Sequence, residues 1–73
     1  MSETFPSPIP GPDLAALRRE MGVTQLALAT RMGVHRITLN GWERAHTVDP
    51  LRAARYRRAL REIVDEATGA TVA

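Results

Sequence analysis

Residues 24–43, TQLALATRMGVHRITLNGWE, decide how this chain folds. They hold two segments in which apolar residues recur at helical spacing, separated only by Met32-Gly33-Val34. A connection this short prevents two helices from lying antiparallel, and its glycine permits the positive φ that a sharp turn requires. The stretch therefore predicts two helices that cross steeply.

The second of these helices, expected over about residues 35–44, has two different faces. Leu39 and Trp42 define its buried edge. Its exposed face carries His35, Arg36, Ile37, Asn40 and Gly41. A polar and cationic face on a helix that follows a sharp turn is typical of a helix-turn-helix that presents this helix to DNA.

Capping residues delimit the helices around the turn. Asp13 is expected to cap a first helix that ends near Met21, with Gly22 directly after it. Thr24 is expected to cap the second helix, because its hydroxyl can accept from the free N–H groups of the first turn. The inward face of this helix is formed by Leu28, Ala29 and Met32.

A fourth helix is predicted to begin at Asp49-Pro50, because proline at the first helical position sacrifices no hydrogen bond. Apolar residues then recur at helical spacing, at Ala53, Tyr56, Leu60, Ile63, Val64 and Ala67. No segment alternates as a strand does. The sequence therefore predicts an all-α domain.

One folded domain is expected between two flanking segments. Prolines at positions 6, 8, 10 and 12 favour extended backbone, so residues 1–12 are predicted to form a flexible arm. Residues 13–67 form the domain, with the last helix serving in dimerisation, and residues 68–73 are expected to fray.

Composition excludes several classes of protein. A chain of 73 residues without cysteine has no disulfides and no thiolate metal sites. The N-terminus lacks the basic start and apolar block of a signal peptide, and no long apolar run is present. We therefore expect a cytoplasmic protein without a membrane span.

Positive charge is concentrated in the middle of the chain. All ten basic residues are arginines between Arg18 and Arg61, and this span holds three acids, which gives it a net charge of +7. Codon bias towards arginine would explain the lack of lysine but not the concentration of charge. A basic span in a small helical domain indicates a polyanion as the partner.

Several motifs resemble the phage Cro and lambda-type repressor (XRE-like) family over about residues 13–60. They are Gly22-Val23-Thr24-Gln25, Leu28-Ala29, Met32-Gly33-Val34, Leu39 and Trp42-Glu43-Arg44. The resemblance implies a four- to five-helix lambda-repressor-like fold that binds a palindromic operator in double-stranded DNA as a homodimer. Small, single-domain members of the family often repress their own promoters, including regulators of phage lysogeny and repressors that accompany anti-CRISPR genes, and the resemblance implies such a role for this chain.

The resemblance also assigns DNA contacts. Arg36 falls at the first base-contacting position, where arginine can donate two hydrogen bonds to guanine. Ile37 is expected against a thymine methyl, and Asn40 against adenine or a phosphate. Contacts to the DNA backbone are expected from Thr24, Gln25, Arg31, His35, Thr38 and Arg44. The family's glutamine at the position of Gln25 also braces the first base-contacting residue, here Arg36.

A dimer surface is predicted on the fourth helix, because this helix has more apolar face than three short helices can cover. The residues expected there are Tyr56, Leu60, Ile63 and Val64, with the core as the other possibility for Tyr56. Two positions depart from the family pattern. Gly41 stands where many relatives have a long polar side chain on the third helix. Ala45 stands where the family commonly has the glycine that ends this helix. The helix therefore either continues to His46 or ends without a left-handed cap.

Other functions have less support in the sequence. No carboxylate pair, phosphate-binding glycine loop or metal-ligand cluster is present, so we expect no enzyme activity, no cofactor, no metal and no small-molecule ligand. Glu43 is expected to pair with an arginine or cap a turn. An antitoxin that binds both an operator and a toxin is the alternative function, and a pure protein-interaction module is a third.

Overall fold

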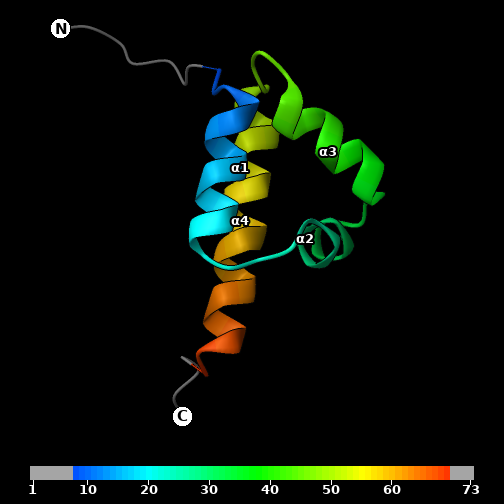
Figure 1. Cartoon of the computed structure of the whole chain (residues 1–73). Helices are drawn as coiled ribbons and strands as arrows, with labels where there is room; N and C mark the ends of the chain where they lie inside the picture. The colour runs from blue at the N-terminus through cyan, green and yellow to red at the C-terminus, as the bar shows by residue number, and fades with distance from the viewer. Residues whose placement is uncertain (1–7, 70–73) are drawn as a thin grey trace, which may run out of the picture.

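The computed structural model describes residues 8–69 as four helices in the order α1 (Gly11–Glu20), α2 (Gln25–Met32), α3 (Arg36–Arg44) and α4 (Pro50–Ala67). The predicted all-α fold is confirmed. Figure 1 shows α1 alongside the long α4, with α2 and α3 on one side of this pair. Within the described residues, no helix has both the length and the apolar character that a membrane span requires.

The core lies where all four helices meet. Every helix contributes at least one nearly inaccessible side chain, and the most deeply buried are Leu14, Leu28, Leu39, Tyr56 and Leu60. Ala29 and Ala53 are equally buried, and their small side chains allow neighbouring helices to approach closely. Helix α3 is therefore fixed by its inner face against α1 and α2.

The predicted caps of α2 and α4, and the predicted turn between α2 and α3, are confirmed. Thr24 Oγ1 accepts a hydrogen bond from the Ala27 N–H at 3.1 Å, and Asp49 Oδ2 accepts from the first-turn N–H groups of α4. Gly33 has φ +73°, the left-handed conformation required by the sharp turn between α2 and α3. These local signals position the two helices of the motif.

Helix α1 begins earlier than expected. It starts at Gly11 after Pro10, so Asp13 lies in the first turn rather than at the cap, and Pro12 is tolerated because first-turn N–H groups lack helical partners. Ile9 and Val48 pair through two backbone hydrogen bonds, of 2.7 and 3.3 Å. The prediction of a flexible arm is therefore wrong for residues 9–12, and residues 1–7 lie outside the described part.

Gly11 explains this ordered start. Its N–H donates to the Ala45 carbonyl at 3.0 Å, and a Cβ at position 11 would stand 2.1 Å from the Trp42 carbonyl oxygen. Only glycine allows α1 to approach the end of α3 this closely. The prolines of this segment do not indicate the contact, because the partner of Gly11 lies more than thirty residues away in the sequence.

The two ends of α3 resolve the remaining alternatives. His35 is its N-cap, with Nδ1 accepting from the Ile37 N–H at 3.1 Å, so the helix proper begins at Arg36. At the other end Ala45 has φ −71° and ψ 147°, and the helix stops at Arg44 without a left-handed cap. At the chain's end, Thr68 and Gly69 follow α4, and the predicted fraying of residues 70–73 lies outside the described part.

Part of the predicted dimer surface is wrong. Tyr56 and Leu60 are both 0% exposed and belong to the core of the single chain, because α1 and α2 both pack against α4 and cover this face. Ile63 and Val64 are only partly buried. They border an open, mainly apolar groove between the end of α1, the start of α2 and the last turns of α4.

Candidate nucleic-acid interface

The outer face of α3 is accessible along its length. Arg36, Thr38, Gly41 and Arg44 are exposed, and the Ile37 side chain is 65% exposed. An isoleucine this accessible gains nothing from the core, so it is available for apolar contact with a partner. The structure thus presents Arg36 and Ile37 on one surface, as the sequence predicted.

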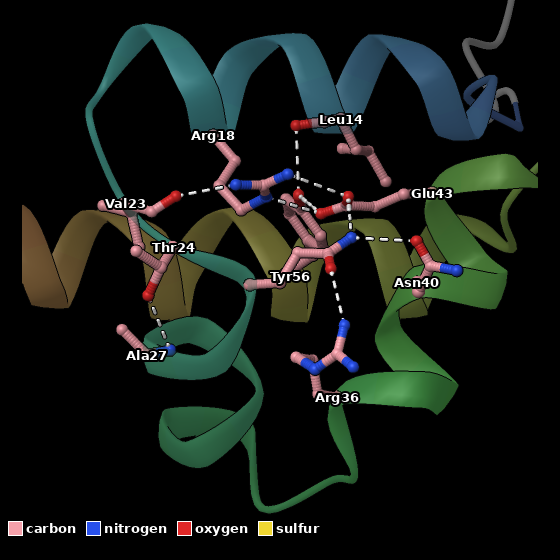
Figure 2. Close-up of polar contacts among 10 residues, drawn as sticks. Leu14, Arg18, Val23, Thr24, Ala27, Arg36, Asn40, Glu43 and Tyr56 are labelled. Atoms are coloured by element: carbon pink, nitrogen blue, oxygen red, sulfur yellow. Dashed lines mark hydrogen bonds and ion pairs between the residues drawn. The ribbon is translucent and has the colours of Figure 1, made fainter.

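Gln25, at the start of α2, connects this surface to the interior. Its Nε2 donates to Asn40 Oδ1 at 3.0 Å and to Glu43 Oε1 at 2.9 Å, while its Oε1 accepts from Arg36 Nη1 at 3.4 Å. The amide of Asn40 keeps its nitrogen directed away from this bond (Figure 2). Gln25 therefore touches two of the three residues predicted to contact bases.

The Glu43 carboxylate, on the inner face of α3, accepts four hydrogen bonds. Arg18 donates from Nε to Oε2 at 2.7 Å and from Nη2 to Oε1 at 3.1 Å, in a two-pronged ion pair. Gln25 and the Tyr56 hydroxyl donate the other two. Figure 2 shows Arg18 of α1 and Tyr56 of α4 converging on Glu43. The predicted pairing of Glu43 with an arginine is confirmed.

The surroundings keep Glu43 and Arg18 ionised and the Tyr56 hydroxyl protonated. Burial raises the pKa of Glu43, but hydrogen bonds from Arg18, Tyr56 and Gln25 outweigh burial, so the pKa lies below its usual value. The hydrogen bond with Glu43 raises the pKa of Arg18, against the opposing effect of burial. Burial, reinforced by Glu43, raises the pKa of Tyr56, which keeps the hydroxyl protonated as a donor. The carboxylate is therefore an acceptor only.

The predicted DNA-backbone contacts fall into two groups. Thr24, His35, Thr38 and Arg44 are exposed near the surface of α3, and the first two also cap helices. Arg31 is different, because it forms ion pairs with Glu62 and Glu66 of α4. The two amide protons of Gln25 are also already donated, so a phosphate contact from its amide would require breaking a bond within the chain.

Two members of the buried cluster, Arg18 and Tyr56, were not predicted from the sequence. Arg18 is only 8% exposed although it is an arginine, and it also donates to the Val23 carbonyl at 2.8 Å. The sequence places Tyr56 in the core or on a dimer surface, and predicts no role for its hydroxyl. A tyrosine at an apolar helical position is the one sequence signal for such a role, since a buried hydroxyl requires a partner.

The aromatic edge of α3 carries a further contact. The Arg52 guanidinium lies 4.9 Å from the centroid of the half-buried Trp42 ring, which ties the first turn of α4 to the inner side of α3. Tyr56, on the same helix, reaches α3 through Glu43. Helix α4 thus holds α3 at two points.

Four helices with a sharp α2–α3 turn and an accessible third helix define a helix-turn-helix domain of the lambda-repressor type. A family described as helix-turn-helix matches residues 14–63, more than half of the chain. The chain belongs to this helix-turn-helix family of XRE type, a family of DNA-binding transcriptional regulators and not of enzymes. No curated protein and no solved structure matches it.

Proposed function

We propose that this protein is a sequence-specific repressor of its own operon that binds a palindromic operator as a homodimer. Helix α3 of each subunit enters the major groove, where Arg36 contacts guanine, Ile37 a thymine methyl and Asn40 an adenine or a phosphate. Thr24, His35, Thr38 and Arg44 contact the DNA backbone. Arg31 and the Gln25 amide make no phosphate contact in this arrangement, because both are engaged within the chain.

One observation carries the proposal: the chain holds Arg36 in place without neutralising it. Within residues 8–69 no carboxylate forms an ion pair with Arg36, and its contact is the neutral Gln25 carbonyl oxygen at 3.4 Å. A guanidinium has five N–H donors, and this contact uses one. The remaining donors are free for the O6 and N7 atoms of guanine, the commonest specific contact in the major groove.

The dimer is proposed on the parts of α4 that remain accessible. Ile63 and Val64 border the apolar groove, together with Met21, which is 43% exposed. Covering these side chains with a second copy would remove apolar surface from water. Two subunits would place their α3 helices in successive major grooves, about 34 Å apart. A dimer that binds both half-sites at once then has a higher affinity for the operator than one subunit has for a single half-site.

The test of base contact compares two arginines. The wild-type protein first selects its preferred site from a library of random duplex DNA, and the affinity of Arg36→Ala for that site is then measured by fluorescence anisotropy. We expect a loss of roughly tenfold or more, the range of one good arginine–guanine contact. Arg61→Ala is the matched control, because it removes the same charge from an exposed position on α4. The control should weaken binding slightly and equally for all sequences.

A folded Arg36→Ala protein with full affinity and unchanged sequence preference would refute the proposed contact. The dimer is tested separately by light scattering at micromolar concentration. We expect the mass of two chains for the wild type and a shift towards one chain for Ile63→Glu, which places a charge on the groove. A wild-type protein with the mass of one chain at this concentration would refute the homodimer.

A further inference from the structure

We propose that Tyr56, a core residue of α4, is a positioning residue for DNA sequence recognition. It acts on the Arg36 guanidinium through two intermediates, the Glu43 carboxylate and the Gln25 amide. The inference rests on the proposed function, since it assumes that Arg36 contacts a base. Tyr56 itself is 0% exposed, so its effect on DNA recognition is indirect.

The first step fixes the Glu43 carboxylate. The Tyr56 hydroxyl has one proton and two acceptors within reach, Glu43 Oε2 at 2.5 Å and the Leu14 carbonyl oxygen at 3.1 Å. The carboxylate is charged and nearer, so it receives the proton in a charge-assisted bond. Together with Arg18 Nε, Tyr56 holds Oε2 in place and so determines where Oε1 lies.

The second step fixes the Gln25 amide. An ionised carboxylate can only accept, so Gln25 must turn its NH₂ group towards Glu43 Oε1. The same NH₂ group satisfies Asn40 Oδ1. The opposite end of the amide, the carbonyl oxygen, then points outward and accepts from Arg36 Nη1.

The third step is the consequence for Arg36. If the NH₂ group and the carbonyl oxygen of the Gln25 amide exchanged places, the NH₂ group would face Arg36. A guanidinium has only N–H donors, so this contact would be lost. The carboxylate that Tyr56 orients therefore determines whether Arg36 is braced or free. A braced arginine loses less conformational freedom when it binds a base, and so discriminates better between bases.

The experiment measures base preference rather than affinity alone. The probes are the site selected by the wild-type protein and the same duplex with its guanine replaced at the position that Arg36→Ala ceases to distinguish. The readout is the ratio of the two dissociation constants. We expect Tyr56→Phe to lower this ratio about three- to tenfold, the effect of roughly one hydrogen bond, with affinity for unrelated DNA unchanged.

Two further variants separate positioning from stability. Leu60→Val is the matched control, because Leu60 is equally buried one turn later on α4 and has no part in the polar cluster. It should lower stability but keep the wild-type ratio. In an Arg36→Ala background, Tyr56→Phe should have no further effect on the ratio, because the side chain on which it acts is absent.

A second measurement leaves the hydroxyl in place. Tyr56 is the only tyrosine of the chain, so growth on 3-fluorotyrosine labels this position alone. Its fluorine NMR signal should shift when the selected duplex is added, although Tyr56 is buried, and Gln25→Met should remove most of that shift. This measurement decides the question if Tyr56→Phe does not fold.

The outcomes are distinct. A Tyr56→Phe protein with the wild-type ratio, or a fluorine signal whose response to the duplex is unaffected by Gln25→Met, overturns the inference and leaves the proposed function standing. A wild-type protein that selects no preferred sequence overturns the proposed function and the inference together. A lowered ratio in Tyr56→Phe with an unchanged ratio in Leu60→Val supports the inference.

Discussion

The inner and outer faces of α3 differ in how completely the chain satisfies them. On the inner face, the Glu43 carboxylate accepts four hydrogen bonds from three other helices. Within residues 8–69, no buried side-chain nitrogen or oxygen lacks a partner. On the outer face, Ile37 is 65% exposed and Arg36 has one long hydrogen bond to a neutral group.

Within the nine residues of α3, one face therefore serves stability and the other is available for binding. On the inner face each Glu43 carboxylate oxygen accepts two hydrogen bonds, so substitutions there should act on folding first. The outer face is left for a partner, so its substitutions should act on binding first. Gln25 is the exception, because it contacts both faces.

The largest expected effect comes from the inner face. Arg18→Met leaves a buried carboxylate without its cation, and we expect the free energy of unfolding to fall by about 3–5 kcal/mol. Urea unfolding followed by circular dichroism measures the loss. The control is Arg58→Met, which breaks an ion pair with Glu62 that is largely exposed and should change stability by less than about 0.5 kcal/mol. Equal losses in both variants would contradict the contrast between buried and surface pairs.

Acid should weaken the same cluster, though less than removal of Arg18 does. The pKa of Glu43 in the folded chain lies below its ordinary value of 4.5, so its stabilising contribution is complete above that value. As pH falls below 4.5 the unfolded chain takes up a proton first, and the contribution disappears once pH passes the lowered pKa of the folded chain.

Urea unfolding between about pH 6 and about pH 3 measures this dependence. Glu62→Gln, which removes a partly exposed carboxylate outside the buried cluster, should retain the acid sensitivity of the wild type. A free energy of unfolding that stays constant over this range would show that Glu43 gains no stability from its ionisation.

A smaller effect is expected where α1 meets the end of α3. Gly11→Ala would place a Cβ 2.1 Å from the Trp42 carbonyl oxygen and 2.9 Å from that of Ala45, so the backbones must separate. We expect a loss of about 1–3 kcal/mol, the usual result of overpacking. Thermal unfolding measures it. Wild-type stability in this variant would mean that residues 9–12 do form a free arm, as the sequence first indicated.

The sequence predicted the parts of the fold that depend on neighbours in the chain. Thr24, Gly33 and Asp49 act within a few residues of themselves, so cap and turn chemistry was sufficient to place α2, α3 and the start of α4. The exposure of Ile37 followed from helical periodicity alone. The resemblance to a known family added the bracing of Arg36 by Gln25, which the structure also shows.

Contacts between distant residues were not predictable in this way. Arg18 and Glu43 are 25 positions apart, and nothing local distinguishes this arginine from the nine others. Helical spacing places Tyr56 on the apolar face of its helix. It does not show whether the chain's own helices or a second copy cover that face, so the sequence could not decide between core and dimer surface. The same limit explains the wrong assignment of Leu60 to a dimer surface.

The smallest effect, and the only gain, is expected on the outer face. Gly41 lies inside α3 without a positive φ, and a Cβ built there meets no atom within 4 Å. Gly41→Ala should therefore raise the free energy of unfolding by about 0.5–1 kcal/mol, since alanine restricts the unfolded chain and favours the helix. Thermal unfolding without DNA measures this gain. The same variant's affinity for the selected duplex shows whether the missing side chain serves binding. A more stable protein that binds less tightly would indicate that DNA approaches the α3 backbone at Gly41, whereas a loss of stability would contradict the open outer face itself.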